Sequence, residues 1–337
     1  MSRSWYLRLA IAAAVLAFGV IVLGAYVRLS AAGLGCPDWP GCYGHVGVPE
    51  THAAIARADA LHPNRPVQPA RAWKEMIHRY FAGTLATLIL VLAVAAWWRR
   101  AQTKRPVLLP TLTLLTVVFQ ALLGMWTVTL LLFPPVVMGH LLGGFTTFAL
   151  LVLMVLQGGD WLRCRAEAGR FMRGLVAVAL VVLICQIALG GWTSSNYAAV
   201  ACPDFPTCQA QWWPAGMDFR DGFSWHGVGP DYQGGILPQA ARMAIHVTHR
   251  IGALVTFLLL AATSLMFVFK AQSRTLKCLG GLAGILVLAQ AGLGIGMIEL
   301  GLPLALADAH NGVAALLLGT LVALTWSVWS REKSHAH

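Results

Sequence analysis

The sequence predicts an all-α integral membrane protein whose eight transmembrane helices form two tandem four-helix bundles related by a pseudo-two-fold axis. Of its 337 residues, 58% are hydrophobic and only 11% are charged, whereas about 25% of the residues in a soluble domain are charged. Eight apolar stretches are long enough to cross a bilayer, and landmark residues of the first half recur in the second. This composition excludes a cytosolic enzyme, a disordered chain and a nucleic-acid-binding domain.

Each predicted span contains about 20 apolar residues, the number that an α-helix needs to cross a hydrocarbon core of about 30 Å. The first apolar run is longer than the core of a signal peptide, which has about 7–15 residues, and is therefore counted as a span. Two long loops, roughly 29–75 and 194–242, connect the first span to the second and the fifth to the sixth. The spans cover residues 6–28, 76–98, 108–132, 136–158, 171–193, 243–269, 275–299 and 304–329.

The basic residues predict how the chain is oriented, because lysine and arginine are enriched in cytoplasmic segments. With a cytoplasmic N-terminus, 15 of the 24 basic residues fall on the cytoplasmic side, and the two long loops face outward. Both termini are therefore predicted to be cytoplasmic, in a bacterial inner membrane. The net charge of +11 follows from these flanking residues and does not require a nucleic-acid partner.

A tandem repeat relates residues 1–165 to residues 166–337. The spacing between matching landmarks stays between 166 and 171, although the residue types involved are rare in an apolar chain. Because each half contains an even number of spans, both halves have the same topology and are related by an axis along the membrane normal. The recurring landmarks are Cys36 and Cys202, Cys42 and Cys208, His78-Arg79 and His249-Arg250, Gln120 and Gln290, Gly124 and Gly294, and His140 and His310.

Four histidines lie at matched depths near the outer ends of predicted spans: His78 and His140 in the first half, His249 and His310 in the second. Polar side chains inside spans are costly and indicate function. Two imidazoles that face each other across a helical bundle suit the axial positions of a haem iron. The alternative is that they hydrogen-bond to neighbouring helices or line a polar cavity. The equal repeat spacing favours haem, and structural zinc is disfavoured because no four ligands are grouped.

One position distinguishes the halves. Glu75 stands three residues before His78, whereas His246 stands three residues before His249. A spacing of three places each residue on the same helix face as its histidine. A carboxylate beside a haem could exchange protons during a reaction, which suggests that the first half performs chemistry. Equally, Glu75 could simply cap the first turn of the second span.

The arginines that follow two of these histidines, Arg79 and Arg250, are predicted to stand near the outer interface. There they could pair with haem propionates or extend toward lipid headgroups. The sequence does not separate these two roles.

The seven cysteines form two groups. Cys36 with Cys42 and Cys202 with Cys208 lie on outward loops, where disulfides persist. A disulfide in either pair could shape its loop, which is favoured, or exchange electrons with an external thiol. The remaining three, Cys164, Cys185 and Cys278, are interpreted as packing residues or free thiols.

Together these residues resemble haem A synthase. The resemblance rests on the eight spans in two halves, the stretch Glu75–Arg79, the four histidines and the paired outer cysteines, and it covers essentially the whole chain. It implies oxidation of the C8 methyl of haem O to a formyl group, which gives haem A for terminal oxidases. It also implies that His249 and His310 hold the iron of haem B, with the substrate haem near His78 and His140.

The resemblance further implies that Glu75 is important for activity and that Cys36 and Cys42 can form a disulfide. The second pair, Cys202 and Cys208, is not expected in every member, and no role for His246 is implied. Haem O synthase is the expected donor of the substrate. The electron donor, a quinol or a thiol protein, stays open, as does a homo-oligomer.

Two other functions fit parts of this pattern. A dihaem cytochrome b-like electron carrier would also use four axial histidines, but it would not need Glu75 and both of its haems would be permanent. A transporter built on a 4+4 repeat would want charged groups near the membrane midplane. Here the polar residues gather at the outer ends of the spans, so a transporter is the least favoured function.

Overall fold

The computed structural model describes residues 3–103, 107–159 and 169–330. Within these residues, eight helices are long and apolar enough to cross a membrane, as predicted. Three short helices, α2 (His52–Leu61), η1 (Ala198–Ala201) and α7 (Phe219–Gly222), lie in the two long loops. The eight long helices are α1 (Arg3–Leu29), α3 (Pro69–Thr103), α4 (Leu108–Thr129), α5 (Pro134–Gly158), α6 (Arg170–Ser195), α8 (Gln239–Lys270), α9 (Arg274–Glu299) and α10 (Leu304–Trp329).

Several predicted boundaries differ from the structure by three residues or more, and three of these differences have identifiable reasons. The second and sixth helices were expected to begin at residues 76 and 243, but they begin at Pro69 and Gln239. Their first turns are polar, so the apolar pattern starts later than the helix does. The third span was expected to reach residue 132, but α4 ends at Thr129. Leu131 and Leu132 have φ values of 53° and 61°, which a continuing right-handed helix does not allow.

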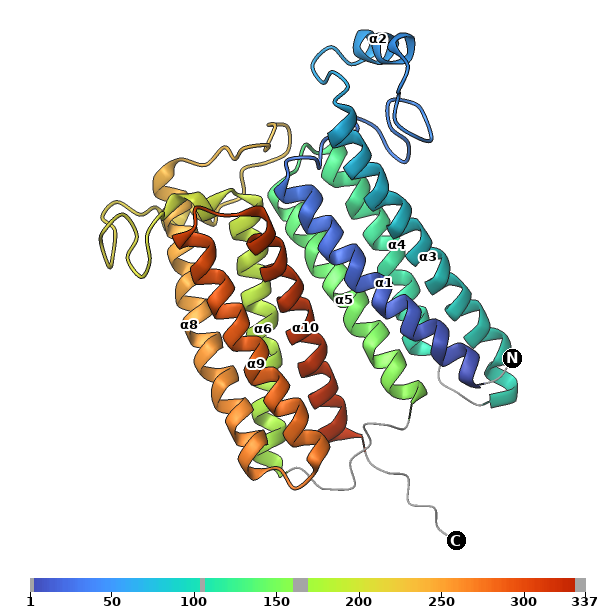
Figure 1. Cartoon of the computed structure of the whole chain (residues 1–337), viewed down its shortest axis with the longest axis vertical. Helices are drawn as coiled ribbons and strands as arrows, with labels where there is room; N and C mark the ends of the chain where they lie inside the picture. Colours follow the sequence, from blue (N-terminus) through green and yellow to red (C-terminus); the bar gives the residue numbers. More distant parts are fainter. Residues whose placement is uncertain (1–2, 104–106, 160–168, 331–337) are drawn as a thin grey trace.

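The long helices run roughly parallel to one another and lie side by side (Figure 1). In the first half, α1 packs against α3 and α5, and α4 packs against the same two helices. In the second half, α8 packs against α6 and α9, and α10 packs against the same two. Both long loops, with α2 on one of them, lie at one end of the molecule, and the α8–α9 connection lies at the other (Figure 1).

The two halves meet through α1 and α5 on one side and α6 and α10 on the other. Helix α10 is the most buried of the eight. Small residues allow this close packing: Gly312 lies against Val22 of α1, and Gly319 lies against Phe148 of α5. Without a hydrophobic driving force between helices in lipid, such small-residue contacts supply much of the packing energy.

Polar contacts also join the halves at the end where the long loops lie. Arg28 of α1 donates a hydrogen bond to the hydroxyl of Tyr197 over 2.8 Å and to the main-chain oxygen of Ser194 over 3.1 Å. Arg65 forms an ion pair with Asp231 at 3.3 Å. The backbone N–H of Tyr232 donates to the oxygen of Leu131 over 3.0 Å. The loop of each half is therefore anchored on the other half.

Candidate functional site

Each of the four predicted histidines lies against a glycine on a neighbouring helix. An added Cβ would lie 2.8 Å from the imidazole Cε1 at Gly24 and 3.2–3.3 Å from it at the other three glycines, so the absence of a side chain lets each ring approach the helix closely. The glycines place a flat backbone surface behind each ring and fix how deeply the ring sits. We call each combination a histidine seat. The four seats are Gly24 of α1 with His78 of α3, Gly124 of α4 with His140 of α5, Gly190 of α6 with His249 of α8, and Gly294 of α9 with His310 of α10.

The seats are arranged as the repeat predicts. His78 and His140 lie on α3 and α5, which both pack against α1 and α4, and His249 and His310 lie on α8 and α10, which both pack against α6 and α9. All four side chains are half-buried. The Nδ1 atom of His78 is buried and has no hydrogen-bond partner in the part of the chain that the structure describes. Two imidazoles per half, each held against a glycine, are a donor set that fits the two axial positions of a haem iron.

The side chain of Glu75 is buried near the outer end of α3 and is paired with Arg79. The residue is only 8% exposed, and its Oε1 accepts a hydrogen bond from Nε of Arg79 over 3.0 Å. Because α3 begins at Pro69, Glu75 lies beyond the first turn. The alternative that it merely caps this helix is therefore wrong. A buried carboxylate needs a partner of this kind to remain charged.

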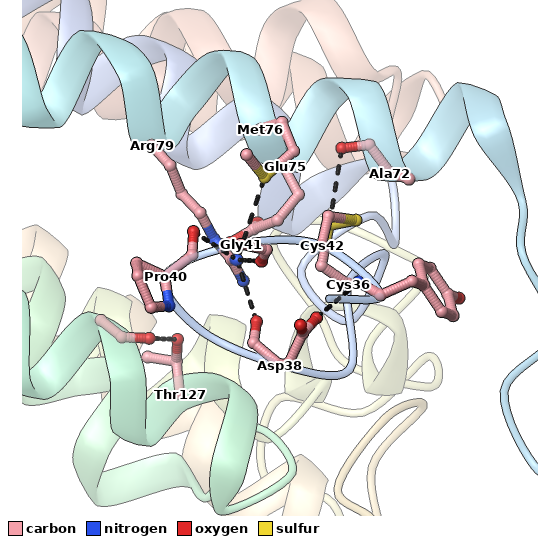
Figure 2. A network of polar contacts seen from close by, with 12 residues as sticks. Cys36, Asp38, Pro40, Gly41, Cys42, Ala72, Glu75, Met76, Arg79 and Thr127 are labelled. Atoms are coloured by element: carbon pink, nitrogen blue, oxygen red, sulfur yellow. Dashed lines mark hydrogen bonds and ion pairs between the residues drawn. A yellow bond between two sulfur atoms is a disulfide. The ribbon is translucent and has the colours of Figure 1, made fainter. Parts of the chain in front are cut away.

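Arg79 also binds the disulfide loop, as Figure 2 shows. Its Nη1 donates to the main-chain oxygens of Asp38, over 2.9 Å, and of Gly41. One guanidinium thus connects the Glu75 carboxylate to the loop closed by the Cys36–Cys42 disulfide. Its Nη2 is buried without a partner among the described residues, so one donor is left for an acceptor such as a propionate.

The second half repeats this connection without the carboxylate. Arg250 donates through Nε to Nε2 of His246 over 3.2 Å, and through Nη1 and Nη2 to the oxygens of Thr207 and Cys202. His246, whose role the sequence left open, occupies the place of Glu75 and is 4% exposed. Both arginines therefore hold their loops, and their predicted role at haem propionates stays a prediction.

Both predicted disulfides are present, and an aspartate shapes each loop. Asp38 accepts hydrogen bonds from the backbone N–H groups of Tyr43 and Gly44 over 2.6 and 2.7 Å. Asp204 does the same for Gln209 and Ala210. The Thr207 hydroxyl and these N–H groups hold the pKa of Asp204 below its usual value, so the carboxylate that closes the loop is charged at neutral pH.

The other cysteines lie apart from this site. Cys185 and Cys278 are free and exposed, which confirms their interpretation as free thiols. Cys164 lies outside the described residues.

Sequence reasoning missed Gly24 and Gly190, although both keep the spacing of 166 that the cysteines show. It also missed Gln186, which contacts His249.

The glycine behind His78 gives a direct test of the seats. We expect Gly24→Ala to displace the His78 ring, because the new Cβ would lie 2.8 Å from Cε1. The variant should bind less haem in the first half and leave the second half unchanged. Gly190→Ala, the matched variant, should do the reverse. Haem extraction and quantification check both. Equal losses from both halves in each variant would contradict the assignment of separate seats.

Known proteins are similar to this chain over nearly its whole length. Residues 7–322 match the COX15-CtaA family model, described as a cytochrome oxidase assembly protein. A heme A synthase from Shewanella oneidensis is 44% identical over 99% of both chains. A heme A synthase from Halalkalibacterium halodurans is 24% identical over 94% of both chains. One from Caulobacter vibrioides is 24% identical over 94% of this chain and 93% of its own. The chain therefore belongs to the COX15-CtaA family of cytochrome oxidase assembly proteins.

Proposed function

We propose that this protein is a haem A synthase, a membrane oxidoreductase that converts the C8 methyl of haem O into the formyl group of haem A. One observation carries the proposal furthest. A buried, arginine-paired carboxylate, Glu75, stands one turn from His78 in the first half, while His246 takes its place in the second. A protein that only carried electrons between two haems would not need this difference.

The first half, residues 1–165, is the substrate half. His78 and His140 hold the iron of the substrate haem, and Glu75 lies one helical turn from His78. Oxidising a methyl group to a formyl group removes protons as well as electrons. Glu75 accepts a proton there, and its ion pair with Arg79 keeps the carboxylate charged between turnovers. The burial of Glu75 supports this role, because few water molecules compete for the proton.

The second half, residues 166–337, is the cofactor half. His249 and His310 hold the iron of haem B, which when bound relays electrons from an external donor to the substrate half. Arg250 keeps the Cys202–Cys208 loop in place over this half, and His246 rather than a carboxylate stands at the place of Glu75. The repeated histidine seats support two four-helix bundles related by a pseudo-two-fold axis, one bundle for each haem.

Both termini lie in the cytoplasm, and the long loops and histidine seats lie toward the outer face of a bacterial inner membrane. The distribution of basic residues supports this orientation. Haem O synthase supplies the substrate within the membrane. A quinol or a thiol protein exchanges electrons with the enzyme, and a homo-oligomer is compatible with the exposed apolar helix faces.

The test is haem extraction and chromatography of the purified protein, with a reduced-minus-oxidised spectrum. We expect haem B together with haem O, haem A or a hydroxylated intermediate. Two molecules of haem B per chain and no other haem would overturn the synthase assignment in favour of an electron carrier. A preparation without any haem would return the histidines to a structural role.

A further inference from the structure

Three of the four histidine seats have a glutamine one helical turn before the glycine. Gln120 precedes Gly124, Gln186 precedes Gly190 and Gln290 precedes Gly294, each by four residues. The Oε1 atoms of all three glutamines are buried and have no hydrogen-bond partner in the described part of the chain. In the fourth seat, behind His78, the position four residues before Gly24 is Val20.

Gln186 contacts the His249 imidazole itself. Its Nε2 lies 3.0 Å from Nδ1 of His249 and donates to the main-chain oxygen of the same residue, also over 3.0 Å. Gly252, one turn further along α8, leaves room for this amide, because a Cβ there would run into Oε1 of Gln186. The amide therefore fixes the ring from its Nδ1 side and leaves Nε2 free.

In the first half, the His140 seat has a similar amide and glycine, Gln120 and Gly143. There Gln120 donates to the main-chain oxygen of His140, and the ring Nδ1 has no partner among the described residues.

The His78 seat lacks both the amide and the glycine. At the positions that correspond to Gln186 and Gly252 through the repeat, it has Val20 and Phe81. Neither side chain can hydrogen-bond to an imidazole. Among the described residues, the Nδ1 atoms of His78, His140 and His310 are all buried without a partner, whereas Nδ1 of His249 has the Gln186 amide.

The difference matters for a metal ligand. A neutral histidine that binds iron through Nε2 carries its proton on Nδ1, and a hydrogen bond from that N–H fixes the ring and raises the basicity of the ligand. The structure places the amide nitrogen of Gln186 on Nδ1. To accept a hydrogen bond from an Nδ1–H, the amide turns over and presents Oε1, which has no partner among the described residues. The bond to the main-chain oxygen of His249 is then given up. Loss of such a partner typically weakens metal affinity by about 10–100-fold.

We propose that Gln186 is the positioning residue that makes the haem of the second half permanent, and that its replacement by Val20 lets the haem of the first half exchange. The inference rests on the proposed function, since it explains how one fold retains a cofactor and releases a product. Gln186 acts through His249 and touches no reacting atom.

The test measures haem release directly. Purified protein is mixed with excess apomyoglobin, and transfer of haem B is followed by absorbance. We expect Gln186→Leu to release haem B about 10-fold faster or more and to raise its midpoint potential, because a less basic ligand stabilises the ferric iron less. Gln186→Glu, which keeps an acceptor oxygen, should release haem B at close to the parent rate. Gln120→Leu removes a buried amide from the first half and should not change haem B release.

The reciprocal variant Val20→Gln with Phe81→Gly transplants the arrangement into the first half. It should slow the release of haem O and haem A to apomyoglobin without changing haem B release. Because it leaves the second half unaltered, it also tests the inference in the case that Gln186→Leu does not fold. Parental haem B release and potential in Gln186→Leu, or parental release of haem O and haem A in the reciprocal variant, would overturn the inference. Chromatography of the parent protein tests the proposed function separately, because that function fails if haem B is the only haem found.

Discussion

Replacing Glu75 with glutamine leaves haem B bound but lowers the yield of haem A by about 100-fold or more, the range that a general acid–base group contributes. Glutamine keeps the shape of the side chain and can still accept a hydrogen bond from Nε of Arg79, so the disulfide loop stays in place. What is lost is a group that can accept a proton beside His78. Haem O, or a partly oxidised haem, should therefore accumulate in the first half.

The measurement is extraction and chromatography of the haems from cells that produce haem O, with the parent protein alongside. His246→Gln is the matched control, because it changes the corresponding partner of Arg250 in the second half. That variant should keep haem A formation well above that of Glu75→Gln. Parental haem A yield from Glu75→Gln would show that the carboxylate is not required and would remove the main argument for chemistry in the first half.

The sequence predicted the eight helices and the repeat because both depend on local composition. Twenty apolar residues in a row have few alternatives to a membrane helix, and rare residues such as His140 and His310 make a repeat visible. The start of α3 could not be predicted in this way, because its first turns carry Lys74 and Glu75 and extend beyond the apolar run. That error of seven residues is what made a capping role for Glu75 plausible.

The candidate site was predictable only in part. The histidines stand out because imidazoles are rare inside apolar helices. The glycines behind them do not, because the chain contains 34 glycines and only the packing of helices shows that Gly24 touches His78. The contacts of Arg79 with the Asp38 and Gly41 carbonyls depend on how the loop folds back over α3, and no sequence pattern encodes that path.

Removing an axial histidine of the second half should empty that half of haem. We expect His249→Ala and His310→Ala each to lose most of the haem B, since the iron would keep one protein ligand instead of two. His78→Ala and His140→Ala should keep haem B and lose the substrate and product haems. These four variants form a matched set, because each removes one imidazole that lies against a glycine of a neighbouring helix.

Quantification of haem B per chain, with the reduced spectrum, decides between the assignments. Unchanged haem B in His249→Ala and His310→Ala would place the cofactor elsewhere, and loss of haem B from all four variants would mean that the two halves do not hold their haems independently.

The expected pattern of haem loss would also explain how the two halves divide the work. A second half that holds its haem in the absence of substrate can be reloaded with electrons between turnovers, while the first half releases haem A and accepts the next haem O. One repeated fold then performs both tasks, because the two copies differ at Glu75 and His246 and in what stands behind His78 and His249.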